Sequence, residues 1–119
     1  MKDCIFCKIV NRESPASIVF EDDTSMVIEP IDPISKGHVL VLPKKHFVNI
    51  LDTDDETLSH LAVVSKNVGH TLLEKNNAHA MNVLHAGGME AQQSIFHFHF
   101  HIVPRYEKDG LDLWFRNSL

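Results

Sequence analysis

The chain has 119 residues, 44% hydrophobic and 23% charged, which predicts a single domain (residues 1–119) with a core that forms without disulfides. The 11 Lys and Arg against 16 Asp and Glu give a net charge of -5, which argues against a basic face that binds DNA or RNA. No apolar run approaches the ~20 residues that cross a bilayer, and the N-terminal residues lack the pattern of a signal peptide, so we expect a cytoplasmic protein with no membrane partner.

The first part of the chain favours a short helix followed by strands. The helix is expected over residues 4–11. Three strands are expected next, at residues 17–20, 26–29 and 38–42. The second and third strands end at Pro30 and Pro43, because proline cannot donate to a strand ladder.

A long amphipathic helix is expected after these strands. Thr53 and Glu56 have the spacing of a capping box, and the two aspartates between them suit the positive end of the helix dipole. Apolar residues then recur at spacings of three and four, which places on one face Leu58, Leu61, Val64, Val68 and Leu72. Residues 75–77 end the helix.

Two more strands are expected, at residues 81–84 and 94–103, with Pro104 ending the second of them. Strands grouped around one central helix predict an α+β domain with a mainly antiparallel, five-stranded sheet. The tail, residues 105–119, is polar except near Trp114 and Phe115, and we expect it to dock on another surface.

Histidine alternates with apolar residues in the last predicted strand. In a strand one face would carry Phe96, Phe98, Phe100 and Ile102. His97, His99 and His101 would share the other face, with neighbours ~6.6 Å apart. Threonine or valine would suit a strand better, so the pattern indicates a metal ligand, a proton carrier or a nucleophile toward phosphorus more than packing alone. The histidines expected to be exposed or structural are His60, His70, His79 and His85.

Cys4 and Cys7 have the C-x2-C spacing that can place two thiolates on one tetrahedral zinc ion. Spacing alone leaves the remaining ligands open among His38, His46, His97 and His101. The alternatives are two buried thiols without a metal, or a redox pair, which normally follows a strand in a βαβ unit. Zinc is the favoured interpretation.

These residues together resemble the histidine triad (HIT) family of nucleotide hydrolases and transferases, over nearly the whole chain. Residues 97–103, HFHFHIV, fit the family signature H-φ-H-φ-H-φ-φ at every position. Gln93-Ser94, residues 37–46 (GHVLVLPKKH) and residues 4–9 (CIFCKI) also match. The likeness is greatest to the small bacterial-type members with a C-x2-C, and to the Hint branch in length and layout.

The resemblance implies a HIT-like fold and a homodimer in which two sheets join. The implied substrates are purine nucleotides of the NMP-X type, such as nucleoside phosphoramidates and dinucleoside polyphosphates. His99, neutral and held by a backbone carbonyl, would attack the α-phosphate, and His101 would position the phosphate and help to protonate the leaving group. Ser94 would hold phosphate oxygens, and His38 would support the network. The resemblance places a structural zinc ion on Cys4, Cys7, His46 and His97.

The nucleoside pocket that the resemblance implies is apolar, and its residues are equally well explained as core: Ile5, Phe6, Ile9, Ile28 and Ile31. Asp32 and Gln93 are the polar candidates beside it.

Three positions depart from the family pattern. Pro30 stands where an acidic residue for ribose is usual, although Glu29 or Asp32 could replace it.

Ala86 and Gln92 are the other two departures, since the family usually has Asn and Gly there. Fewer polar contacts to a nucleotide leave open a non-catalytic nucleotide-binding or interaction protein of the same fold.

An oxygenase with the three alternating histidines on a metal is a more distant alternative. The C-x2-C and the long helix argue against the barrel that such an oxygenase needs.

Overall fold

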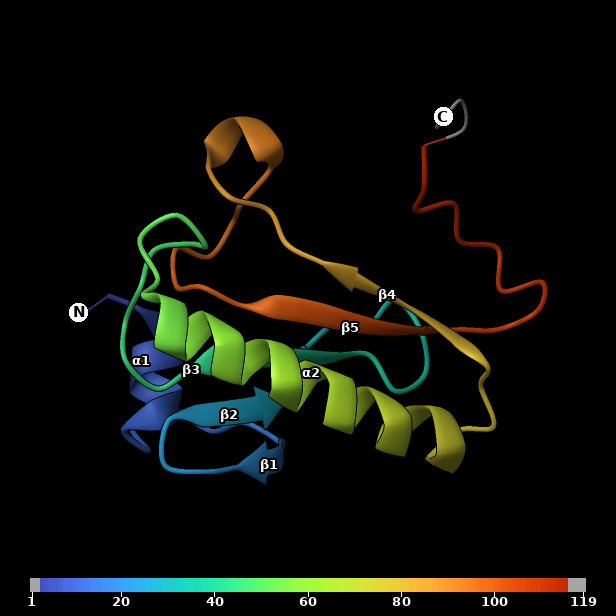
Figure 1. The fold of residues 1–119 in the computed structure, drawn as a ribbon, viewed down its shortest axis with the longest axis horizontal. Helices are drawn as coiled ribbons and strands as arrows, with labels where there is room; N and C mark the ends of the chain where they lie inside the picture. The colour runs from blue at the N-terminus through green and yellow to red at the C-terminus, as the bar shows by residue number, and fades with distance from the viewer. Residues whose placement is uncertain (1–2, 116–119) are drawn as a thin grey trace.

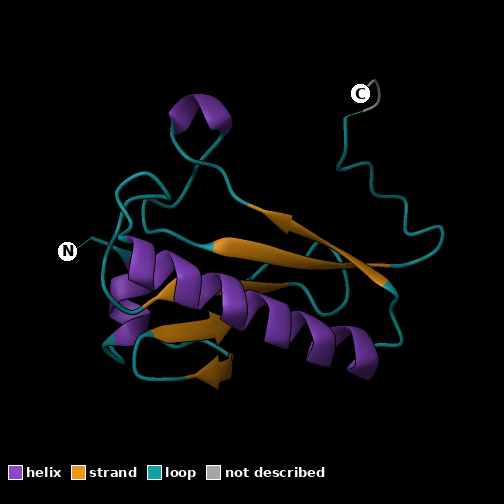
Figure 2. Cartoon of the chain, viewed as in Figure 1, coloured by secondary structure: helices purple, strands orange, loops and turns teal. Residues whose placement is uncertain are grey.

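The computed structural model of the chain describes residues 3–115, which form one antiparallel sheet with a helix on each face (Figures 1 and 2). The strands lie in the order β1-β2-β3-β5-β4, and every neighbouring pair is antiparallel. The elements in chain order are α1 (Ile5–Val10), β1 (Ile18–Glu21), β2 (Ser25–Ile28), β3 (Val39–Pro43), α2 (Asp55–Lys75), β4 (Ala80–Leu84), the 3-10 helix η1 (Met89–Ala91) and β5 (Phe100–Arg105). The predicted fold class, a five-stranded antiparallel sheet with one long and one short helix, is confirmed.

Alternate residues of the central strands pack on opposite faces of the sheet. Val39 and Val41 of β3 point to the face that α2 covers, while Leu40 and Leu42 point to the face that α1 covers. The predicted apolar face of the long helix is confirmed. Leu58 packs against the core, and the other four residues of this face are buried in it: Leu61, Val64, Val68 and Leu72. The sheet therefore separates two apolar layers, and each helix fixes one of them.

The predicted cap of the long helix is wrong by one residue. Asp54 is the N-cap, and its carboxylate accepts a hydrogen bond from the backbone N–H of Thr57 at 3.2 Å. The hydroxyl of Thr53 donates instead to the carbonyl of Asn49, at 2.8 Å. Thr53 is thereby drawn into the preceding turn, and the next residue takes the capping position.

The predicted start of the last strand is also wrong. The strand was expected over residues 94–103, but β5 begins only at Phe100, and residues 95–97 before it form a bend. Phe96 is therefore 43% exposed instead of packing with the other phenylalanines. At the other end, Pro104 does not stop the strand, because β3 pairs with β5 only as far as Ile102 and no N–H is needed on that side.

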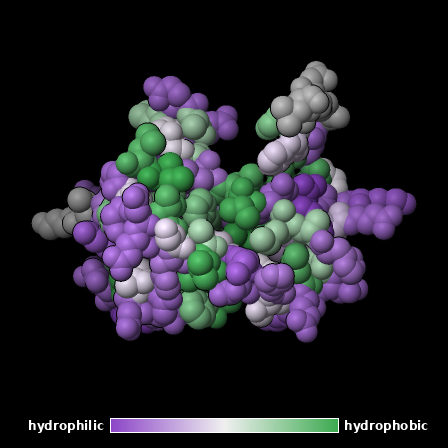
Figure 3. Space-filling model, viewed as in Figure 1, coloured by the Kyte–Doolittle hydropathy of each residue, from purple (hydrophilic) through white to green (hydrophobic). Residues whose placement is uncertain are grey.

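The surface that carries α2 mixes apolar and polar side chains (Figure 3). Exposed apolar residues there include Val63 on α2 and Leu51 in the preceding loop. Trp114 and Phe115 also stay exposed and stack on each other, with ring centroids 5.2 Å apart. The rest of the predicted docking tail, residues 116–119, lies outside the described residues. Within residues 3–115 no helix combines the length and the apolar character that crossing a membrane requires.

Candidate functional site

The ring of His99 lies directly before β5, against Phe6 of α1, with ring centroids 5.2 Å apart. Its Nδ1 is 2.8 Å from the backbone carbonyl oxygen of His97. A carbonyl oxygen can only accept, so Nδ1 carries the ring proton and donates it. Burial lowers the pKa of His99, which keeps the ring neutral at pH 7. The lone pair on Nε2 is therefore free to attack an electrophile.

Two further histidines, His38 and His101, are hydrogen-bonded to each other beside His99. The backbone N–H of Ile34 donates to His38 Nδ1 at 3.1 Å, so the proton of a neutral His38 is on Nε2. That Nε2 lies 3.0 Å from His101 Nδ1 and donates to it. The proton of neutral His101 is left on its own Nε2. Within residues 3–115 this N–H has no acceptor, which leaves it for a ligand.

The rings of His99 and His101 are adjacent and both neutral. The ring centroids of His99 and His101 are 5.0 Å apart. Burial, followed by the neighbouring His99 and His38, lowers the pKa of His101 to about 4. Burial also lowers the pKa of His38. At neutral pH the three rings thus offer one free lone pair and one free N–H within a small space.

A separate cluster joins α1 to the segment that follows β3 and to the segment that precedes β5. The ligand atoms of its four members lie within 4.8 Å of one another: Cys4, Cys7, His46 and His97. His97 Nε2 donates to the carbonyl of Pro43 at 2.8 Å, so its Nδ1 keeps a lone pair. This Nδ1 lies 3.3 Å from Cys4 Sγ and 3.2 Å from His46 Nδ1.

The short helix α1 presents the two sulfurs of this cluster on one side. Cys4 is the N-cap of α1, and its Sγ accepts from the backbone N–H of Cys7 at 3.3 Å. Burial and the adjacent Cys4 sulfur raise the pKa of Cys7 to about 11. Burial lowers the pKa of His97 to about 4. These two groups stay uncharged by themselves, and a bound cation would favour the thiolate and displace its proton.

The structure brings only part of the expected nucleoside pocket together. Phe6, Ile9 and Ile28 are buried in the apolar layer under α1. Ile5 is 43% exposed and Ile31 is 98% exposed, and Asp32 is exposed beside Ile31.

The polar candidates around this pocket are held differently. Ser94 is exposed on the segment that leads to His97. Gln93 is buried, and its amide accepts from the N–H of Gly88 and donates to the carbonyls of Val48 and Ile95. Its side chain therefore holds the glycine-containing loop in place.

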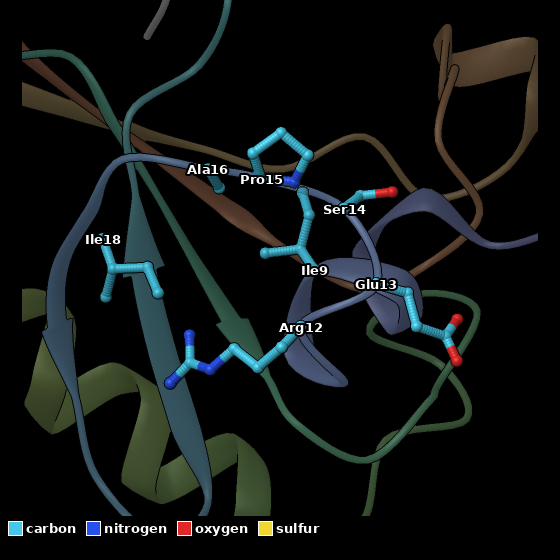
Figure 4. A pocket seen from close by; sticks show the side chains of 7 residues that line it. All are labelled: Ile9, Arg12, Glu13, Ser14, Pro15, Ala16 and Ile18. Carbon is cyan, nitrogen blue, oxygen red and sulfur yellow. The ribbon is translucent and has the colours of Figure 1, made fainter.

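A cavity of about 390 Å³ lies beyond the C-terminal end of α1 (Figure 4). Its lining is mixed in polarity and contains no histidine, and it consists of Ile9, Arg12, Glu13, Ser14, Pro15, Ala16 and Ile18. Only Ile9 is shared with the expected nucleoside pocket. The cavity is therefore distinct from the histidine site.

The HIT domain family matches residues 11–108, and the chain belongs to the HIT family. An uncharacterized HIT-like protein of Methanocaldococcus jannaschii is 44% identical over 108 residues, which are 90% of this chain and 82% of that protein. Adenylylsulfatase HINT3 of Arabidopsis thaliana is 35% identical over 117 residues, which are 98% of this chain but 58% of that longer protein.

Solved structures share the fold closely. A hypothetical histidine triad nucleotide-binding protein of Sulfolobus tokodaii superposes with a TM-score of 0.85 at 43% identity, covering 87% of this chain and 70% of that one. A Zn-bound histidine triad family protein of Mycobacterium smegmatis superposes with a TM-score of 0.89 at 35% identity, covering 98% and 85%. At these identities the likeness extends beyond the fold to the family.

Proposed function

We propose that this protein hydrolyses nucleotides of the NMP-X type, in which X is an amine or a second phosphate group, through a nucleotidyl intermediate on His99. The observation that carries the proposal is the state of His99: its Nδ1–H is bound by a backbone carbonyl, and its Nε2 lone pair is free. A neutral imidazole held in this way is a preorganised nucleophile toward phosphorus. Membership of the HIT family and the relative named adenylylsulfatase support a reaction at a nucleotide phosphate.

In the first step the Nε2 lone pair of His99 forms a bond to the α-phosphorus, and the bond from phosphorus to X breaks. The N–H at His101 Nε2 donates a hydrogen bond to a water molecule, which gives a proton to the departing X and is left as hydroxide. His38 donates to the opposite nitrogen of that ring and so keeps the ring proton on Nε2. The exposed Ser94 hydroxyl and neighbouring N–H groups would hold the non-bridging oxygens, on which negative charge develops.

In the second step this hydroxide attacks the same phosphorus, and the bond between His99 and phosphorus breaks. The nucleoside monophosphate leaves, and the His99 ring returns to its starting state. One difficult displacement is thereby divided into two easier ones.

We propose that the cluster of two cysteines and two histidines holds a structural zinc ion. Two thiols and two imidazoles are a donor set that zinc prefers, and the lone pair of His97 Nδ1 faces both sulfurs. The Zn-bound relative supports this assignment. A zinc ion here would supply a fixed orientation for His97, whose carbonyl in turn holds His99.

The proposal also includes a homodimer, located in the cytoplasm. The strand β4 is at the edge of the sheet and Val83 on it is 47% exposed, which supports pairing of two copies at this edge. Light scattering of wild-type protein and of Val83→Lys tests this, and the variant is expected to be monomeric.

The test of function is a substrate panel on the pure protein. Adenosine and guanosine phosphoramidates, dinucleoside polyphosphates and adenylyl sulfate are incubated with it, and released AMP or GMP is measured by chromatography. Release that is lost in His99→Ala is the expected result. Nucleotide binding measured by calorimetry without any release would instead support the non-catalytic alternative.

A further inference from the structure

The main chain that carries His97 and His99 lies outside the strand ladder, because β5 begins at Phe100. Its backbone groups instead form individual hydrogen bonds with another segment and with side chains. The N–H of Phe98 donates to the carbonyl of Phe47 at 2.7 Å. The carbonyl of His97 accepts from the His99 ring, as described above. The carbonyl of His99 is held by a side chain from the end of β4, His85.

His85 makes two hydrogen bonds that require the same tautomer. Its Nε2 accepts from the backbone N–H of Ile50 at 3.2 Å, so Nε2 has no proton in the neutral ring. The proton is then on Nδ1, which lies 3.2 Å from the carbonyl oxygen of His99 and donates to it. A single neutral form of the ring thus connects the loop before α2 to the main chain of His99.

Aromatic side chains pack against the ring of His85. The ring of His85 meets Phe98 edge to face, with centroids 4.9 Å apart and an interplanar angle of 88°, and it also contacts Phe100. Gly87 leaves the space that the ring needs, since a Cβ at that position would lie 3.3 Å from His85 Nε2. The residue is therefore held by contacts on its faces and at both nitrogens.

We propose that His85 is a positioning residue for the nucleophile. By donating to the His99 carbonyl, it fixes the peptide from which the His99 side chain projects, and by accepting from Ile50 it anchors that peptide to the loop before α2. His85 acts through the main chain and does not touch the substrate. This inference rests on the proposed function of His99 and adds a histidine that the triad pattern does not include.

Two substitutions separate the two hydrogen bonds. In His85→Asn the amide nitrogen takes the place of Nδ1 and keeps the donor to the His99 carbonyl. In His85→Gln the amide oxygen takes the place of Nε2 and keeps the acceptor for Ile50, but the donor to His99 is lost. His70→Gln makes the same chemical change at an exposed position of α2 and is the matched control.

We expect His85→Gln to lower kcat about tenfold with KM within twofold of wild type, because misplacement of a reacting group affects the chemical step and not uniform binding. His85→Asn, which keeps the donor to the His99 carbonyl but loses the acceptor for Ile50, is expected to lower kcat no more than about threefold, and His70→Gln is expected to keep kcat within about twofold of wild type. Equal kcat in His85→Gln and wild type, or an equal loss in the Asn and Gln variants, would overturn the inference.

A readout that is independent of turnover is the ¹H–¹⁵N NMR spectrum of the imidazole rings. Wild type is expected to show the Nδ1-protonated form for both His85 and His99, and the ring signals of His99 should shift in His85→Gln but not in His85→Asn. If His85 is Nε2-protonated, or if the His99 signals are unchanged in both variants, the inference is wrong. Wild type with these spectra but no turnover on any nucleotide would contradict the proposed function and leave the positioning role supported.

If His85→Gln does not fold, the NMR spectrum of wild type decides: Nδ1-protonated His85 is the expected result, and Nε2-protonated His85 would overturn the inference.

Discussion

His97 and His99 are two residues apart, and their rings are held in opposite ways. His97 donates from Nε2 to the carbonyl of Pro43, so its free lone pair is on Nδ1 and faces the two sulfurs. His99 donates from Nδ1 to the carbonyl of His97, so its free lone pair is on Nε2. The same side chain is thus suited to bind a metal in one place and to attack phosphorus in the other, and a backbone carbonyl makes the selection. The comparison teaches that tautomer, more than residue type, separates the two sites.

The largest effect is expected from removing His99, the proposed nucleophile. His99→Ala is expected to lower kcat by roughly 10⁴-fold or more, because no other described ring offers a free lone pair at that position. Turnover of a nucleoside phosphoramidate and the melting temperature are measured together. The His70→Ala control should keep full turnover, and a His99→Ala protein that retains wild-type turnover would exclude His99 as the nucleophile.

Removing one of the four proposed zinc ligands should affect both sites. Cys4→Ser is expected to reduce the zinc content from about one ion per chain to a small fraction of that. The melting temperature should fall by roughly 10 °C, because metal binding stabilises the folded state. We also expect kcat to fall by about 10-fold to 100-fold, since His97 links the cluster to His99. Atomic absorption and thermal unfolding provide the check, and a metal-free variant as stable as wild type would contradict the zinc site.

The donor role of His101 sharpens the comparison between leaving groups. His101→Asn is expected to lower kcat about 10²-fold for a phosphoramidate of an alkylamine, which must be protonated as it leaves. For a nitrophenyl ester of AMP, whose leaving group departs as an anion, the loss should be about fivefold or less. Steady-state kinetics with both substrates measures the difference. An equal loss for the two would argue against a role of the His101 N–H in protonating the leaving group.

A smaller effect is expected in the dependence of stability on pH. Burial lowers the pKa of His97 and His101 to about 4, whereas the ordinary value of 6.5 applies after unfolding. Between these values the unfolded chain binds more protons, so the free energy of unfolding decreases as pH falls below 6.5 and levels off below about 4. For His97 the loss at pH 5 is about 2 kcal/mol.

Urea unfolding at pH 7 and pH 5, with a chelator present, measures this loss. His101→Gln should lose less stability over this interval than wild type, because one of the contributing groups is absent. His70→Gln, which removes an exposed ring, should lose as much as wild type. A stability that is the same at both pH values would contradict the neutral, buried state of these histidines.

The parts of the fold that depend on local sequence could be predicted from it. The spacing of Leu61, Val64 and Leu72 is enough to define the buried face of α2, because a helix places such residues together whatever packs against them. The grouping of Cys4 and Cys7 with His46 and His97 followed from the resemblance, since spacing alone left four histidines open. The structure brings these four side chains together.

The remainder depends on partners that are distant in sequence. The start of β5 could not be predicted, because the bend before it is held by Phe47 and Pro43, about fifty residues away. The tautomer of His97 follows from the same distant carbonyl of Pro43. The link between His85 and His99 could not be found either, since a lone histidine after a strand has no periodic pattern to distinguish it.

The most direct measurement is the capture of the intermediate. Wild-type protein is mixed with a nucleotide substrate labelled at the α-phosphate and quenched in alkali, because bonds between histidine and phosphorus break in acid. After digestion, mass spectrometry locates the nucleotidyl group. We predict that it is found on the peptide containing His99, bonded through Nε2, and is absent from His99→Ala. Confirmed turnover with no nucleotidyl group on His99 at any quench time would contradict the account.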